Sequence, residues 1–258
     1  MNNYPTCWND ITVDTFIQID AITKLNPKNE DEYNLHLVSL LCDMPIDEVE
    51  IMDYKEFNSL VQQFMFIRQL PIKPPKKTVE TKGGTMHLFL DLKKMTNGEI
   101  NDIEYLLPDY AQNIKLILAI VYRQKLENIN PILFEDEFEK YGNWIKLRSN
   151  LFGNLCINDV YTIIPSIIKQ REEIYQSYEG LLAGPPEDDD EDLSTYSEVD
   201  RAILIKAKDE EQKIRKWGWH LFIYQLANND PLQIQKAYEL NFVFSLNIMS
   251  MKRQMNIK

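Results

Sequence analysis

The sequence predicts a mainly α-helical protein, a helical bundle-like chain with one β-hairpin inserted around residues 77–91. Three observations favour this fold class. Between the helix-breaking residues, most segments repeat apolar side chains at the three- and four-residue spacing of a helix. The 258 residues include only eight glycines, which disfavours a turn-rich all-β fold. The clearest strand pattern surrounds Lys82-Gly83-Gly84, and Gly-Gly between two β-type runs is typical of a hairpin turn.

Residues 1–70 are expected to form a helical N-terminal module. Thr12 has the side chain of an N-cap, so the first helix should start beside it. The second helix is expected at Asn29–Asp43, where acidic residues occupy the first turn and complement the helix dipole. Asp53 is the expected cap of a third helix that carries Phe57, Leu60, Val61, Phe64 and Phe66.

Residues 71–95 are expected to hold a Pro/Lys linker and the hairpin. Three prolines within five residues favour extended chain, and the strands are predicted at Thr78–Thr81 and Thr85–Leu90. A small basic cluster surrounds the hairpin and consists of Lys73, Lys76, Lys77 and Lys82. Three interpretations stay open: a solvated linker, a nucleic-acid contact, or an acceptor for an acidic segment.

Residues 96–183 are expected to form a helical middle region. Thr96 and Glu99 have the spacing of a capping box, which predicts a helix start there. Further helices are expected at Tyr110–Tyr122, Asp136–Phe152 and Ile157–Tyr178. Pro165 interrupts the last of these and should kink it, because proline removes a backbone donor.

Residues 184–196 are expected to be an acidic disordered linker before the C-terminal helices of residues 197–258. Its core is a run of six acids: Glu187, Asp188, Asp189, Asp190, Glu191 and Asp192. Adjacent like charges repel one another and offer no apolar area to bury. The helices that follow are predicted at Ser197–Asn228, Pro231–Leu240 and from Phe242 to about Gln254.

The composition of the chain disfavours nucleic acid and membranes as partners. The formal net charge is −12, and an acidic surface repels both phosphate backbones and anionic lipid. The N-terminal residues lack the basic and apolar regions of a signal peptide, and no run of about 18 apolar residues predicts a membrane span. The three cysteines are widely spaced, which is typical of free thiols. We therefore expect a cytoplasmic protein.

No catalytic pattern occurs in the sequence. His36, His87 and His220 lie in different segments, and none has a Cys, His or Asp at metal-ligand spacing. The sequence contains no nucleophile elbow, zinc-binding helix signature or phosphate-binding loop. We therefore predict no catalytic, cofactor-binding or metal-binding residues and a non-enzymatic role.

The expected functional surface lies in the C-terminal helices. Two tryptophans open a segment whose apolar residues leave no clean polar face, and such a helix must be covered by other protein. Methionines further along suit adaptable apolar contacts, although a fraying core helix would have the same composition. The candidate partner-binding residues are Trp217, Trp219, Leu221, Tyr224, Met249 and Met251.

Two motifs resemble a known group of proteins. Asp91-Leu92-Lys93-Lys94-Met95-Thr96-Asn97-Gly98 and Trp217-Gly218-Trp219, in this order, resemble proteins from the structural-gene clusters of tailed bacteriophages, crAss-like and other Bacteroides-type phages among them. The acidic run is not part of that pattern. The resemblance implies a tail assembly chaperone or virion-assembly protein in the host cytoplasm that can enter the virion.

The same resemblance implies which partners to expect. They are other phage structural proteins, such as tail, tape-measure or portal components, and further copies of the chain itself. Two alternatives stay open: a structural virion component such as a connector, ring or tail subunit, and a DNA-associated or host-directed regulator.

Overall fold

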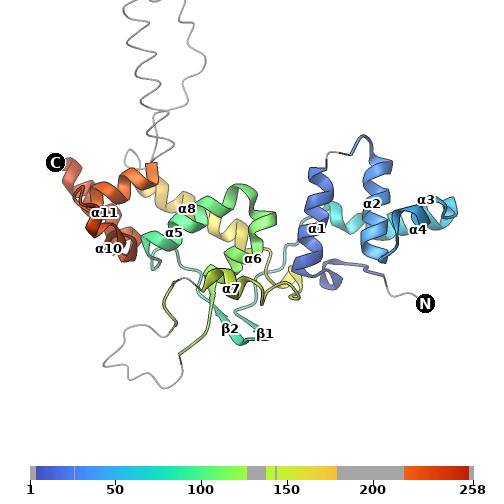
Figure 1. Ribbon diagram of the computed structural model, residues 1–258, viewed down its shortest axis with the longest axis horizontal. Coiled ribbons are helices and arrows are strands. Elements are labelled where there is room, and N and C mark those ends of the chain that lie inside the picture. The colour runs from blue at the N-terminus through green and yellow to red at the C-terminus, as the bar shows by residue number, and fades with distance from the viewer. Residues whose placement is uncertain (1–3, 26, 127–137, 143, 179–217, 256–258) are drawn as a thin grey trace, which may run out of the picture. The chain divides into compact units, whose positions relative to one another are not determined.

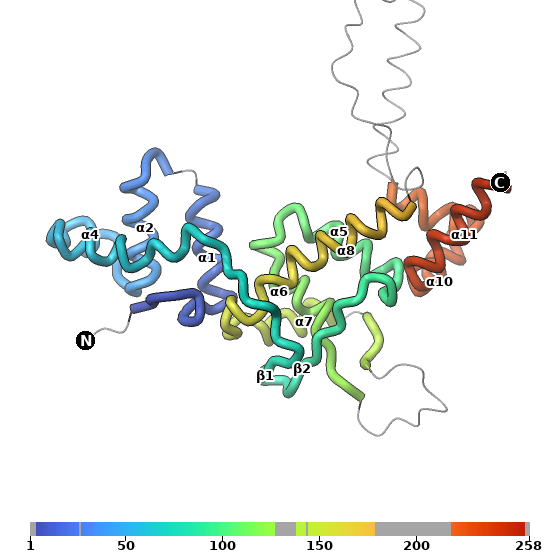
Figure 2. The backbone as a smooth tube through the Cα atoms, turned by 180° about the vertical axis from the view of Figure 1, so that it is seen from behind, coloured from blue at the N-terminus to red at the C-terminus, as the bar shows by residue number. Residues whose placement is uncertain are grey.

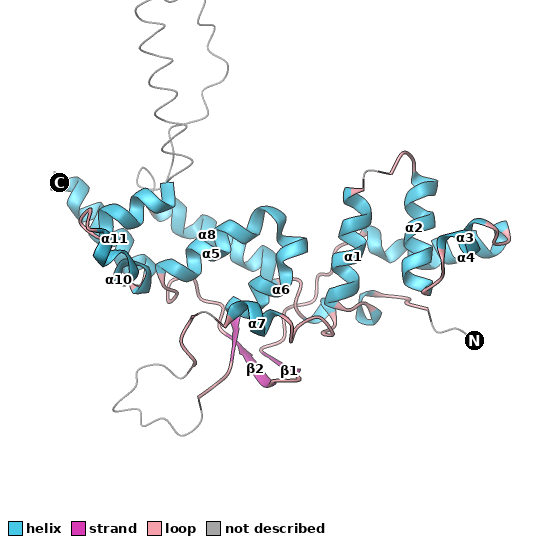
Figure 3. Cartoon of the chain, viewed as in Figure 1, coloured by secondary structure: helices cyan, strands magenta, loops and turns pink. Residues whose placement is uncertain are grey.

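The computed structural model describes residues 4–25, 27–126, 138–142, 144–178 and 218–255. Helices dominate this part of the chain and a small antiparallel sheet accompanies them, as Figure 3 shows, so the predicted fold class is confirmed. The chain divides into two compact units. One comprises Met1–Leu90 with Ile103–Ser166, and the other comprises Asp91–Asp102 with Ile167–Lys258.

The first unit begins with short helices whose starts follow the predicted caps. The Thr12 side chain accepts a hydrogen bond from the Thr15 amide at 3.1 Å, and Asn29 caps the next helix in the same way. Asp43 ends that helix in the left-handed conformation. The elements, seen together in Figure 1, are η1 Trp8–Asp10, α1 Val13–Lys24, α2 Glu30–Cys42, α3 Ile46–Glu50, α4 Tyr54–Gln63 and η2 Phe64–Arg68.

The core of the first unit surrounds α6 (Tyr110–Val121), which is preceded by α5 (Asn97–Leu106) and η3 (Leu107–Asp109). Buried residues occur on every side of α6, which packs against α1 and α7 (Ile145–Ser149). Arg148 of α7 is buried, and its guanidinium donates to the carbonyls of Ala119 and Tyr122 at 3.1 and 3.4 Å. It thereby satisfies acceptors that the end of α6 leaves without helical partners.

The hairpin is confirmed, and it belongs to a larger sheet than the sequence predicted. β1 (Thr78–Thr81) pairs antiparallel with β2 (Gly84–Leu88), with Val79 opposite Met86. β2 then pairs with β3 (Tyr122–Arg123). Tyr122, which was expected to be the last residue of a helix, therefore lies in a strand. The physical reason is tertiary: the Tyr122 ring is fully buried and its hydroxyl donates to the Lys76 carbonyl at 2.5 Å.

The helix predicted at Asp136–Phe152 is wrong over most of its described length. Phe138 forms a β-bridge with Lys125, the Glu139 amide donates to the Gln124 carbonyl, and the helix is restricted to α7. Residues 136, 137 and 143 lie outside the described part of the chain. Pairing with the segment after β3 therefore replaces the helical hydrogen bonds that local periodicity favoured.

The kink predicted at Pro165 is also wrong. Residues 157–159 form a separate 3-10 turn, η4 (Ile157–Asp159), and α8 (Ile163–Ser177) begins only two residues before the proline. Pro165 thus occupies the first helical turn, where backbone amides have no intrahelical acceptor. A proline costs little at such a position.

The C-terminal helices belong to the second unit. Residues 218–226 are helical, and Asn228 and Asn229 follow in positive-φ conformations that end the helix. The predicted start of this helix at Ser197 lies outside the described residues. The chain continues through η6 (Pro231–Gln233), α10 (Ile234–Glu239) and α11 (Phe242–Gln254), where Asn241 caps α11 by accepting from the Phe244 amide.

Candidate protein-binding surfaces

The helix of residues 218–226 has one covered face and one exposed face. The Trp219 ring lies 5.5 Å from the Phe222 ring and 5.6 Å from the Phe242 ring, which ties this helix to α11. Phe222 is buried, whereas Leu221 and Tyr224 stay exposed. Within the described chain, one apolar face of this helix is therefore covered, and the expectation that another protein covers the exposed face stays a prediction. Trp217 and the acidic run 187–192 lie outside the described residues.

The two candidate methionines of α11 have different environments. Met249 is buried with Phe242 and Leu246 and belongs to the core of the second unit, so it offers no surface to a partner. Met251 is exposed. Side-chain direction around the helix explains the difference, because positions 249 and 251 lie about 200° apart.

Met251 is part of an apolar stripe along α11, whose other members were not among the candidates predicted from the sequence. The exposed fractions are 54% for Phe244, 51% for Met251 and 62% for Met255, and half-buried Ile248 lies between them. The spacing i, i+4, i+7 and i+11 places these four side chains on one face. That spacing was visible in the sequence, but burial alone distinguishes this face from the opposite one.

The start of α5 anchors α11 through buried hydrogen bonds. Asn97 is fully buried, and its side-chain amide donates to the Ala237 carbonyl and the Ser245 hydroxyl, both at 2.8 Å. The Asn97 backbone amide donates to the Leu240 carbonyl at 2.9 Å. One residue thus holds α10 and α11 together, which fixes the direction in which the stripe faces.

The residues just before Asn97 extend this anchor. The Asn241 amide group donates to the Lys93 carbonyl at 2.8 Å, and the Phe242 amide donates to the Met95 carbonyl at 2.9 Å. Thr96 and Glu99 form the predicted capping box, with the Thr96 amide 2.7 Å from a Glu99 carboxylate oxygen. The motif Asp91–Gly98 is therefore a structural joint, by which we mean that its hydrogen bonds hold α11 in place.

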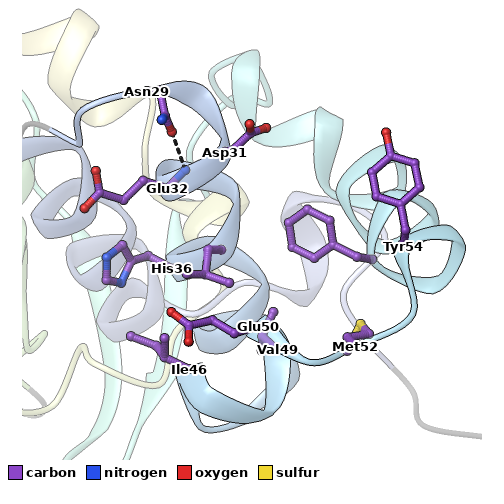
Figure 4. Close-up of a pocket in the computed structure, with 11 residues that line it drawn as sticks. Asn29, Asp31, Glu32, His36, Ile46, Val49, Glu50, Met52 and Tyr54 are labelled. Atoms are coloured by element: carbon purple, nitrogen blue, oxygen red, sulfur yellow. Dashed lines mark hydrogen bonds between the residues drawn. The ribbon is translucent and has the colours of Figure 1, made fainter.

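A pocket in the first unit offers a second candidate surface. It has a volume of about 590 Å³ and is formed by α2, α3, α4 and the turns between them. In Figure 4, Glu32, His36 and Glu50 lie along one side, and Met52 and Tyr54 lie along the other. Leu35, Ile46 and Phe57 also line it and are half-buried, so they present apolar surface to the opening. We call this surface the acidic groove.

The charge of the acidic groove comes from a local excess of carboxylates. Residues 28–57 contain nine acidic residues and two lysines, a formal charge of −7. The predicted candidate residues included none from this segment. The signal available in the sequence was this acidic excess on helices that also carry apolar residues.

The basic cluster is partly neutralised by Asp159. Lys73 and Lys76 each place their ammonium nitrogen 2.6 Å from a different Asp159 carboxylate oxygen, and the Asp159 side chain is only 14% exposed. Burial by itself raises the pKa of this carboxyl, but the hydrogen bonds and charges of the two lysines outweigh burial and hold the pKa below its usual value. Thr162 also donates to the Lys73 carbonyl at 2.6 Å. Figure 2 shows the extended chain that these contacts hold between α4 and β1.

The described cysteines are free thiols. Burial, with a smaller contribution from the charge of Glu56, raises the pKa of the Cys42 thiol to about 11.

The described residues include no group of three or more His, Cys, Asp and Glu side chains that could hold a metal ion. Among the helices described, none has both the length and the apolar character that a bilayer crossing requires.

Comparisons with known proteins identify no family. No protein-family model matches the sequence, and neither a curated protein nor a solved structure matches it.

Proposed function

We propose that this protein is a non-catalytic assembly factor that binds other proteins through helical faces during construction of the tail or virion of a tailed phage. The observation that supports a protein-binding role is the apolar stripe of α11, formed by Phe244, Ile248, Met251 and Met255. The phage context comes from the resemblance of the two sequence motifs. The host cytoplasm is the compartment in which such assembly takes place.

The stripe has the chemistry of a helix-docking surface. Aromatic residues and methionine are enriched at protein interfaces, and methionine adapts its shape to different partners. Anchors spaced by three and four residues are typical of recognition between a helix and an apolar groove. The buried joint at Asn97 holds α11 in one orientation, which lowers the entropy lost on binding.

The alternative as a DNA-associated regulator is less favoured. It relied on the basic cluster, and two of its four lysines already pair with Asp159. The alternative as a connector, ring or tail subunit keeps support, because a second surface of opposite charge to α11 exists in the acidic groove.

The test is co-expression with tail, tape-measure and portal proteins from the same phage genome. Met251→Asp should abolish co-purification of the partner and leave the melting temperature unchanged, since the side chain is already exposed. Ile72→Asp is the matched control, because Ile72 is 90% exposed and lies outside α11. Partner binding that survives both substitutions would contradict the role of the stripe.

The presence or absence of the protein in the mature particle distinguishes a virion component from a chaperone. A chaperone is expected in infected cells and absent from purified particles, whereas a ring or tail subunit is expected in the particles in stoichiometric amounts. Quantitative mass spectrometry of purified virions measures the difference.

A further inference from the structure

We propose that copies of this protein associate head to tail, with the apolar stripe of α11 from one copy lying in the acidic groove of the next. This inference goes beyond the proposed function. It concerns the protein alone and is tested without any phage partner.

The groove has room for apolar side chains of the stripe. The stripe runs from Phe244 to Met255, the C-cap of α11, and these 11 steps along the helix correspond to about 16 Å at 1.5 Å per residue. The volume of the acidic groove, about 590 Å³, is within the usual range of about 300–1,000 Å³ for pockets that bury a ligand. Half-buried Leu35, Ile46 and Phe57 supply apolar contacts for the side chains of the stripe. A helix that lays its apolar face into such a groove is a common recognition mode.

Charge complementarity identifies the occupant as a second copy. Residues 242–258, which contain the stripe, hold three basic residues and no acidic one, a formal charge of +3. The segment that forms the acidic groove has a formal charge of −7. Lys252 lies beside the stripe on α11, and Glu50 lies at the groove. Opposite charges of this kind favour encounter and fix the orientation of the two surfaces.

This geometry produces a heterologous contact, since the two surfaces that meet are different. An open assembly then has one free α11 at one end and one free groove at the other, whereas both surfaces of every copy in between are occupied. Such contacts close into a ring if the rotation between copies allows it, and otherwise extend into an open chain. A phage protein that binds the α11 stripe would compete with the neighbouring copy for the same side chains.

The first measurement is sedimentation velocity of the purified full-length chain from about 1 to about 100 μM, a range that covers moderate affinities. The mean mass should rise with concentration above the 30.5 kDa of one chain. Two variants block one surface each: Met251→Asp disables α11, and Glu50→Lys combined with Tyr54→Asp disables the groove. All three side chains are exposed, so circular dichroism should show an unchanged fold. Each variant alone should weaken association about tenfold or more.

The decisive sample is an equimolar mixture of the two variants. One variant supplies an intact groove and the other an intact α11, so the mixture should form a complex of two chains and nothing larger. A symmetric pair of α11 helices would instead form in the groove variant alone, because that variant keeps its stripe, and would not need the Met251→Asp variant. Ile72→Asp should associate like the unmodified protein.

Three outcomes would overturn the proposal. The first is an unmodified chain that stays monomeric over the whole concentration range. The second is a Met251→Asp variant that associates as strongly as the unmodified chain. The third is a mixture of the two variants that remains monomeric.

Discussion

Asp159 shows how a single residue joins segments that are far apart in the sequence. Lys73 and Lys76 lie more than 80 residues before it, and both reach its carboxylate. The Lys76 amide also donates to the Asp159 carbonyl at 2.8 Å, so backbone and side chain hold the same segment. The proline-rich segment is thus attached to the turn before α8, although its composition is typical of a solvated linker.

The first prediction concerns the pH dependence of the Asp159 ion pairs. The pKa of Asp159 is lowered in the folded protein, so the carboxylate stabilises the fold above its unfolded pKa of about 3.9. This contribution is lost as the pH falls through the folded pKa, because protonation removes the charge. Asp159→Asn should therefore lower the free energy of unfolding at pH 7 by about 1 kcal/mol, and the loss should vanish in strong acid.

Urea unfolding at several pH values measures this effect. Asp109→Asn is the control, since Asp109 pairs with Lys24 at an exposed site where ion pairs contribute little. Equal effects of the two substitutions at pH 7 would contradict a special role for Asp159.

At the scale of elements, α11 depends on a joint that lies well over 100 residues earlier in the chain. Asn97 is buried at the start of α5 and bonds to Ala237 and Ser245. Asn241 and Phe242 bond to the segment just before it. The polar side chains of the motif thus determine how α10 and α11 sit together, and the apolar contacts of Phe242, Leu246 and Met249 complete the packing.

The second prediction is that Asn97→Ala loosens α11. The substitution removes two hydrogen bonds and leaves the buried Ala237 carbonyl without that donor, which typically costs about 1–3 kcal/mol. Hydrogen exchange should become faster in α10 and α11, and urea unfolding should measure the loss of stability. Asn101→Ala, on the same helix at a half-buried site, should change stability by less than about 0.5 kcal/mol. If the rate of hydrogen exchange in α11 were unchanged after Asn97→Ala, Asn97 would not be the residue that holds α11 in place.

At the scale of the whole molecule, charge is distributed unevenly along the chain. The net charge is −12, residues 28–57 have −7, and residues 242–258 have +3. The proposed self-association uses this asymmetry together with the apolar stripe. Apolar contacts supply most of the affinity, while the charges select one surface over the rest of an acidic molecule.

The third prediction is that self-association weakens with salt. Between 0.1 M and 1 M ionic strength the screening length falls from about 10 Å to about 3 Å, so the attraction between α11 and the acidic groove is reduced. The association constant should fall by about tenfold, as measured by sedimentation equilibrium at the two salt concentrations. An association constant that stays the same would mean that charge does not select the groove.

Local hydrogen bonding and periodicity were enough to predict the fold class, the caps at Thr12 and Asp53, the hairpin turn and the bounds of α11. These features depend on residues within a few positions of one another, so a sequence pattern contains their cause. The kink at Pro165 failed as a prediction because the position of a helix start depends on the preceding turn. The helix expected at Asp136–Phe152 failed because pairing with the segment after β3 competes with local helix formation.

Tertiary structure alone decided which apolar and charged side chains face the solvent. Met249 and Met251 are the same residue type two positions apart, yet one is buried and the other exposed, because only one faces Phe242 and Leu246. Tyr122 leaves its helix because burial and the Lys76 carbonyl favour a strand. Lys73 and Lys76 belong to a cluster that is basic in the sequence, yet in the fold both are paired with Asp159. Spacing along the chain fixes local hydrogen bonds, whereas burial and charge pairing depend on neighbours that folding alone brings together.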